Sequence, residues 1–243
     1  MKMNRLLVCA IGVAVLAVVG VSAWLACPAS VMGKEERAVV GELKRAPEIL
    51  FDVTCTNKHA YIDDVFRRIV ELPADRPRKE YAHEFLERIF SMDLERHCPF
   101  DRGTREQRDE SSIVYGFALV KLEHAARRGY EALARLKAPK RERWNVYWRY
   151  LAKYRDEERR MRRLFPKHGD GSLFAMRTFE RKLLLDYEWK YLTDEEFQGV
   201  CSDFEKIIGR PLRTMEQIQQ EADVWTKKNI SESKKASGGN EQF

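Results

Sequence analysis

Apolar residues recur every three or four positions along most of the chain, and no segment alternates apolar and polar residues as a half-buried strand does. Turns built on proline, glycine and aspartate, such as Glu71–Arg78 (ELPADRPR), separate the periodic segments. The pattern predicts an all-α fold, with a single multi-helix, bundle-like domain after an N-terminal signal or anchor helix. Helices are expected at Lys34–Lys44, His59–Leu72, Arg78–Leu94, Arg105–Leu136, Arg141–Phe165, Ser172–Leu192, Asp194–Ile208 and Met215–Lys228.

The expected helix Arg105–Leu136 is apolar on two sides. A helix of this kind is covered on two sides, so it is expected at the centre of the domain. We interpret His124 as a hydrogen-bonded core histidine, because buried polar groups normally find partners. The first apolar stripe is Val114, Ala118, Leu122, Ala125, Gly129 and Leu133, and the second is Ile113, Phe117, Val120 and His124.

The expected helix Arg141–Phe165 has an aromatic side and a basic side. We interpret the aromatic side as core and the basic side as a candidate binding surface. Glu158 lies on the aromatic side and is expected to form an ion pair with Arg155 or Arg162, which are within reach on the same helix. The aromatic side holds Trp144, Tyr147, Trp148, Leu151, Tyr154, Met161 and Phe165, and the basic side holds the candidate binding residues Arg149, Lys153, Arg160 and Arg163.

Positive charge is concentrated around this helix. Residues 135–167 contain 13 basic and 4 acidic residues, whereas the whole chain has a net charge of only +6. A basic helix with an aromatic side suits nucleic acid, an anionic membrane surface or an acidic protein. The chain is also expected to be exported, which disfavours nucleic acid. The expected partner is therefore an envelope protein, an anionic envelope polymer or a lipid surface.

The N-terminus has the parts of an export signal. Lys2 and Arg5 precede an uncharged apolar run at residues 6–26, and small residues lie near its end. The basic side stays in the cytoplasm, so the residues after the apolar run are translocated. The chain is therefore expected in the periplasm or on the outer face of a membrane.

Three fates of this run stay open. Val21–Ala23 is a small-residue cleavage pattern, and Trp24–Cys27 resembles a lipoprotein signal in which Cys27 is acylated. Alternatively, residues 6–26 are retained as an anchor, since about 20 apolar residues suffice to span a bilayer. The expected organisation is a signal peptide or anchor at 1–27, a helical domain at 28–230 and a disordered tail at 231–243.

Two cysteines flank the second and third expected domain helices. A short connection should make these helices pack antiparallel, which brings Cys55 near Cys98. In an oxidising compartment this predicts a disulfide. Cys201 shares an apolar helix side with Val200 and Phe204 and is expected to be a buried thiol.

The sequence indicates no metal and no cofactor. Glu80 and His83 have the spacing used twice in di-metal bundles, but the second copy is missing. Catalysis is the less favoured alternative. It would use His59 and His97, which the Cys55–Cys98 hairpin would bring together.

A segment between Leu136 and Leu185 resembles the LprI-type periplasmic lysozyme-inhibitor family, which consists of small exported helical domains. The stretches that carry the resemblance are LKAPKRERWNVYWRYLAKYRDEE, GDGSLFAM and RTFERKLLL. It implies a protein-binding role in the envelope. The matching residues are Trp148, Tyr154, Arg155, Asp156, Gly171, Ser172, Arg181 and Leu185.

These observations predict an exported, non-enzymatic binding protein of the cell envelope, whose basic helix at 141–165 meets an anionic or protein partner. The alternatives are a lysozyme-inhibitor-like protein, an enzyme with a site near His59 and His97, and a structural or assembly subunit.

Overall fold

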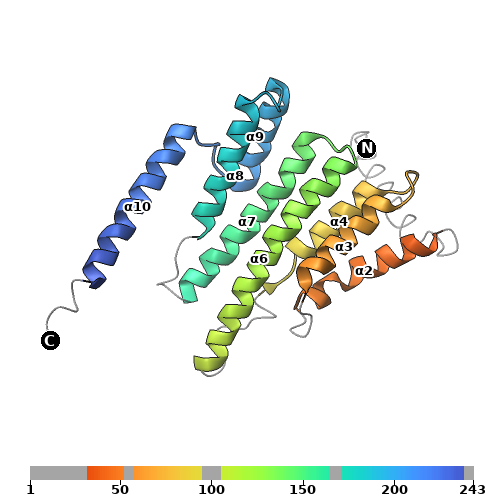
Figure 1. Cartoon of the computed structure of the whole chain (residues 1–243), viewed down its shortest axis with the longest axis horizontal. Coiled ribbons are helices and arrows are strands. Elements are labelled where there is room, and N and C mark those ends of the chain that lie inside the picture. The colour runs from red at the N-terminus through yellow and green to blue at the C-terminus, as the bar shows by residue number, and fades with distance from the viewer. Residues whose placement is uncertain (1–31, 52–56, 95–104, 165–170, 238–243) are drawn as a thin grey trace, which may run out of the picture.

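The structure, a computed structural model, describes residues 32–51, 57–94, 105–164 and 171–237, and the regular structure in these segments is entirely helical. Figure 1 shows the helices ranged across the molecule nearly in chain order, from α2 at one end to α10 at the other. The all-α prediction is confirmed. The helices of the described segments are α2 (Lys34–Phe51), α3 (Lys58–Glu71), α4 (Arg78–Phe90), α6 (Arg105–Arg135), α7 (Lys140–Leu164), α8 (Gly171–Glu188), α9 (Asp194–Ile208) and α10 (Met215–Ser237).

Local side-chain signals set several helix ends. The Asn57 side chain accepts a hydrogen bond from the amide of Ala60 at 3.1 Å, which satisfies a free amide at the start of α3. Thr193 and Glu196 form the expected capping box at the start of α9. Gly209 ends that helix with φ of 81°, a left-handed conformation that glycine adopts without a Cβ clash.

Helix α2 is longer than its sequence indicated. It was expected to end at Lys44, but it continues through Pro47 to Phe51. Proline removes one helical hydrogen bond. The helix continues because its buried positions keep helical spacing across the proline, and their burial outweighs that loss. These positions are Val39, Leu43, Ala46 and Leu50.

Helix α10 is also longer than expected. It was predicted to end at Lys228, with residues 231–243 lacking regular structure, but it runs to Ser237. The glutamate, lysines and alanine of this segment are good helix formers, so they extend a helix that has already begun. The expectation for the tail is therefore wrong as far as Ser237.

Two helices end earlier than expected. Helix α4 was expected to reach Leu94 and ends at Phe90, while α8 was expected to reach Leu192 and ends at Glu188. In α8, Lys190 takes φ of 62°, and the amide of Tyr191 donates to the carbonyl of Asp186 at 2.8 Å. This turn reverses the chain and leads it into α9.

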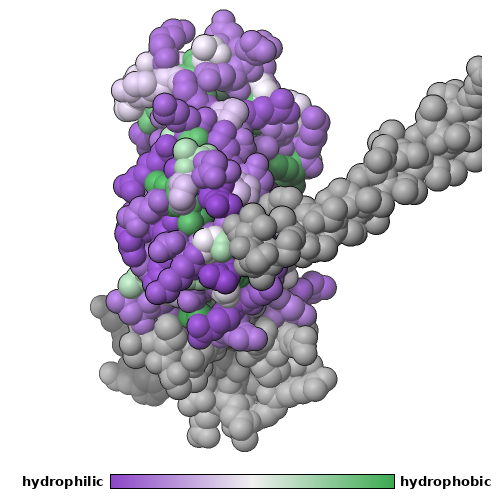
Figure 2. Space-filling model, turned by 90° about the vertical axis from the view of Figure 1, so that its right-hand side faces the viewer, coloured by the Kyte–Doolittle hydropathy of each residue, from purple (hydrophilic) through white to green (hydrophobic). Residues whose placement is uncertain are grey.

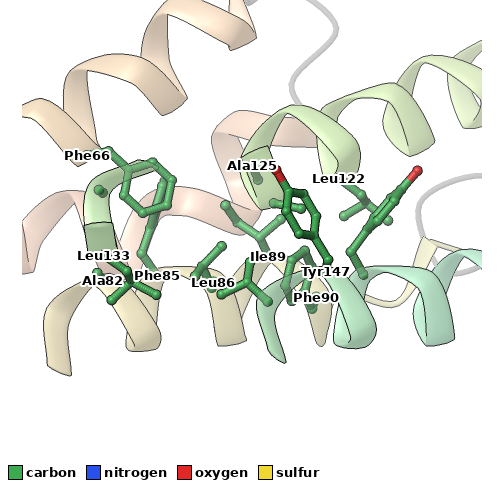
Figure 3. Close-up of a cluster of buried hydrophobic side chains, with 14 of the residues drawn as sticks. Phe66, Ala82, Phe85, Leu86, Ile89, Phe90, Leu122, Ala125, Leu133 and Tyr147 are labelled. Atoms are coloured by element: carbon green, nitrogen blue, oxygen red, sulfur yellow. The ribbon is translucent and has the colours of Figure 1, made fainter. Parts of the chain in front are cut away.

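Helix α6 is the central helix, as predicted, although Val120 of its second apolar stripe is 48% exposed. It packs on α3 and α4 on one side and on α7 on the other. Figure 3 shows the cluster at this junction, where Phe66 of α3 and Phe85 of α4 lie near Leu133 of α6, and Leu122 of α6 lies further along the cluster. This core fixes α7 against the N-terminal helices.

Several predicted features lie outside the described residues. They are the apolar run 6–26, the lipidation candidate Cys27, the proposed disulfide between Cys55 and Cys98, and His97. Among the helices that the structure does describe, none is long and apolar enough to cross a bilayer.

The α4–α6 contact depends on Gly129. A Cβ placed there would lie 2.8 Å from both Cδ atoms of the fully buried Leu86, whereas a Cβ at Gly116 of the same helix meets nothing within 4 Å. We expect Gly129→Ala to lower the free energy of unfolding by about 1–3 kcal/mol through overpacking. Gly116→Ala should leave it unchanged or raise it by up to about 1 kcal/mol, because alanine is the better helix former. Urea unfolding of both variants checks this, and an equal effect at the two positions would contradict the close contact.

Candidate anion-binding surface

The aromatic side of α7 is largely buried, as predicted, although Tyr154 is half-buried and Phe165 lies outside the described residues. Trp144 and Trp148 stack with ring centroids 5.1 Å apart, and Trp148 meets Phe204 of α9 edge-on at 4.9 Å. Tyr147 and Tyr150 pack on Phe179 of α8. These rings join α7 to α8 and α9, so the aromatic residues of α7 form core and do not present a recognition surface.

Three of the four candidate binding residues lie at the interface of α7 with α4. Arg149 is bonded to Glu87 and lies over the Phe90 ring at 5.7 Å. The Lys153 ammonium donates to the carbonyl of Met92 at 2.8 Å. These contacts lie within the protein, although both side chains remain partly exposed, at 32% and 20%.

A buried carboxylate completes this interface. Glu157 is bonded to Lys153 at 2.8 Å and lies 3.5 Å from the guanidinium of Arg160, which also approaches Asp93 at 3.9 Å. A buried carboxylate needs such partners, because removing a charge from water is costly. We call Arg149, Lys153, Glu157 and Arg160 the α4–α7 ionic interface. The fourth candidate, Arg163, is exposed near the end of α7.

The C-terminal end of α7 carries another group of arginines. Arg155, Arg159 and Arg162 follow one another at i, i+4 and i+7 and share one side of the helix. They line a pocket of about 490 Å³ together with Arg210 and Arg213 from the α9–α10 connection. We call this the arginine-lined pocket. Glu158 and Glu221 also line it, as do Leu173, Met176 and Ile208.

Arg210 and Arg213 are held by a fully buried carboxylate, Glu180 of α8. The Arg210 guanidinium donates to both Glu180 oxygens, at 2.8 and 3.0 Å, and Arg213 Nε donates to one of them at 3.0 Å. Burial by itself would raise the pKa of Glu180, but the hydrogen bonds and charges of the two arginines outweigh it and hold the pKa below its usual value. This pair of arginines ties the α9–α10 connection to α8.

Glu158 has a role that the sequence did not predict. Its two oxygens accept hydrogen bonds from the backbone amides of Gly171 and Ser172, at 2.5 and 2.6 Å. The carboxylate thus caps the start of α8, where amides have no helical partner and the helix dipole favours negative charge. Arg155, one expected partner, instead donates to the carbonyl of Ile208 at the end of α9, at 2.5 Å.

The histidines form structural contacts. His124 is buried and bonded to Asp63 at 2.7 Å, which confirms its prediction as a hydrogen-bonded core residue. His59 stacks on His124 at 4.3 Å, and its pKa is lowered by burial and by the nearby charge of Lys121. His83 is bonded to Glu142 at 2.5 Å. Within the described segments, no three metal-binding side chains gather.

Cys201 is half-buried in α9, a weaker burial than the sequence suggested. Burial raises the pKa of its thiol to about 11. At neutral pH the group is therefore a neutral thiol and a poor nucleophile.

The large exposed apolar side chains of the described segments lie on α6, α8, α10 and the α8–α9 connection. None of the large exposed hydrophobic residues in the described segments belongs to α2, α3 or α4, and Figure 2 shows a largely hydrophilic face at that end. Apolar side chains that protrude beside basic residues are typical of binding surfaces. The exposed set is Val120, Leu173, Phe174, Trp189, Tyr191, Met215, Val224, Trp225 and Ile230.

Comparison with family models, with curated proteins and with solved structures finds no match to this chain. The residues that carry the lysozyme-inhibitor resemblance include structural parts of the α7–α8 junction. Trp148 is core, and Gly171 and Ser172 receive the Glu158 cap. A lysozyme-binding role stays a prediction of the resemblance.

Sequence reasoning missed Glu180, Arg210 and Arg213. A signal was present, because Glu180 lies four residues after Met176 and three before Leu183, both on the buried side of α8. A carboxylate at such a position requires positive partners. The sequence alone did not show that they would come from the connection after α9.

We expect Glu180→Gln to lower the free energy of unfolding by about 3–5 kcal/mol at neutral pH, because two arginines would lose their carboxylate. The pKa of Glu180 is lowered in the folded protein from an ordinary value of 4.5. Its stabilisation is therefore complete above that pH and is lost as the pH falls through the folded pKa.

Urea unfolding of wild type and variant between about pH 7 and pH 3 measures this difference. The difference in free energy of unfolding between wild type and Glu180→Gln should become smaller as the pH falls below the ordinary pKa of a glutamate. A difference that stays constant to the lowest pH would contradict the lowered pKa of Glu180. Glu188→Gln, at an exposed position at the end of the same helix, is the matched control and should change little.

Proposed function

We propose that this chain is a non-enzymatic binding protein of the cell envelope, and that it contacts an anionic partner through its C-terminal surface. This surface comprises Arg159, Arg162 and Arg163 of α7 together with the exposed residues Phe174 of α8 and Trp225 of α10. The observation that carries the proposal is the division of the positive charge on α7. Arg149, Lys153 and Arg160 contact α4 or the residues just after it, whereas the arginines at the end of α7 are exposed or line the pocket.

The composition of this surface supports binding. Arg159 is 67% exposed, and it lies 3.8 Å from the carboxylate of Asp156, which is 63% exposed. Such an exposed pair contributes little to stability. Arg177 lies over the Trp225 ring at 5.7 Å, so aromatic and cationic groups adjoin one another. Charged and aromatic side chains together suit recognition of an anionic partner.

The envelope location is part of the proposal and rests on the N-terminal sequence. The run 6–26 supports export by cleavage, by lipidation at Cys27 or by retention as an anchor. Each route places the helical domain outside the cytoplasm, where phosphate-bearing lipids, anionic polymers and other envelope proteins are available as partners.

The contacts of His124 suit a structural role, whereas the alternative site predicted near His59 and His97 stays a prediction because His97 lies outside the described residues. The His124 ring is engaged by Asp63 at 2.7 Å and by Arg127 at 3.2 Å. Asp63 is in turn bonded to Arg128 at 2.7 Å, which joins α3 to α6. A histidine that is already committed on both ring nitrogens suits a structural role better than proton transfer.

Site-specific photo-cross-linking in the native cell tests the proposal. A photo-reactive phenylalanine analogue at Phe174, whose side chain is 66% exposed, should form adducts with an anionic partner. The same analogue at Arg67 on α3 should form few. The double variant Arg159→Glu with Arg163→Glu should remove the Phe174 adducts, because like charges repel an anionic partner.

Lys44→Glu with Arg45→Glu is the matched control, since it makes the same change of charge on exposed positions of α2. Adducts that survive reversal at Arg159 and Arg163, or that fall equally with the control, would argue against an anionic partner at this surface. Recovery of adducts only from the cytosolic fraction would overturn the envelope location.

A further inference from the structure

We propose that the arginine-lined pocket binds a phosphate group that is attached to an apolar body, such as the headgroup of an anionic amphiphile. This inference rests on the proposed function, because it names the ligand that the C-terminal surface would take. It depends on the distribution of charge, hydrogen-bond donors and apolar wall within the pocket.

The pocket keeps a positive charge after its internal pairs are counted. Five arginines and two glutamates line it, and Asp156 and Glu180 pair with those arginines from outside the lining. Glu180 and Glu221 hold Arg213, while Glu158 is occupied by the amides of α8. Five arginines against these four carboxylates leave a formal charge of +1 over the pocket and its partners.

The α7 side offers donors of the right kind. Arg159 projects into solvent at the pocket rim, and Arg162 lines the pocket one turn further along the helix. Arg155 donates one terminal nitrogen to the carbonyl of Ile208, and its buried Nε lies 3.5 Å from a carboxylate oxygen of Asp156. This Nε makes no hydrogen bond within the described residues, so a better placed anionic oxygen would give it an acceptor.

Three guanidinium groups in a row favour phosphate over carboxylate. Each guanidinium can donate two parallel hydrogen bonds to an oxyanion. A phosphate monoester has three terminal oxygens and close to two negative charges, so it can accept from several arginines at once. A carboxylate has two oxygens and one charge, so it cannot accept hydrogen bonds from all three guanidinium groups at once.

Part of the pocket wall is apolar, with Leu173 38% exposed and Met176 and Ile208 each 5% exposed. Leu173 and Met176 of α8 and Ile208 of α9 line the pocket beside the arginines. The volume of about 490 Å³ exceeds what a phosphate alone would fill. A phosphate with an attached apolar chain would place its charge on the α7 arginines and its chain along this wall.

Titration of the full chain in a zwitterionic detergent, followed by the arginine Nε–H signals in NMR, tests the proposal. The probes are inorganic phosphate, octyl phosphate and octanoate at constant ionic strength. Octyl phosphate should bind at least tenfold more tightly than either of the others. If inorganic phosphate binds as tightly as octyl phosphate, the ligand is a free phosphate and the apolar wall has no part. Equal binding of octanoate would overturn selectivity for phosphate.

Variants locate the site. Arg159→Gln with Arg162→Gln should weaken octyl phosphate binding at least tenfold, and Arg159→Gln alone should weaken it by a smaller factor without affecting folding. Arg159→Lys with Arg162→Lys should also bind more weakly than wild type, because lysine keeps the charge but loses the paired hydrogen bonds. If the lysine variant binds octyl phosphate as tightly as wild type, the binding is non-specific electrostatic attraction, and the proposal of a specific phosphate site would be wrong.

Arg67→Gln with Arg88→Gln on α3 and α4 is the control and should bind as wild type. Absence of saturable binding by the wild type would overturn the pocket assignment while leaving the cross-linking result untouched. Conversely, octyl phosphate binding without adducts at Phe174 in cells would leave the pocket standing and count against the wider proposed function.

Discussion

The arrangement of this protein depends on burial of the aromatic side of α7. Trp144 and Trp148 are almost completely enclosed, and each large aromatic side chain removes a correspondingly large apolar area from water. Helix α7 consequently packs against α6, α8 and α9 and also meets α4. Because this one helix contacts both the N-terminal and the C-terminal helices, its orientation determines which of its charged residues can reach solvent.

Three buried carboxylates show how the structure accommodates charge around that core. Glu157 is held by basic residues of its own helix, Glu158 caps α8 through backbone amides, and Glu180 binds two arginines from the α9–α10 connection. Each is costly to bury alone, and each is satisfied by a different kind of donor. Together they connect α7, α8 and the segment before α10, which shapes the arginine-lined pocket.

The sequence predicted the features that depend on periodicity and on short-range signals. The aromatic side of α7, the capping box at Thr193 and the core position of His124 are confirmed, because each depends on a pattern within one helix. Partners from distant segments could not be derived in this way. Helical spacing places Arg149 and Arg163 on the same side of α7, but only the position of α4 shows that one is engaged and the other exposed.

The most direct test of this account compares two double variants of α7 that make the same change in charge. Arg149→Gln with Arg160→Gln alters the α4–α7 ionic interface, whereas Arg159→Gln with Arg163→Gln alters the exposed end. Urea unfolding of the full chain should show a loss of more than about 1 kcal/mol for the first, since charged groups there lose hydrogen bonds or ion pairs. The second should stay within about 0.5 kcal/mol of wild type. Equal losses, or a larger loss from the second variant, would contradict the division of α7 into structural and exposed arginines.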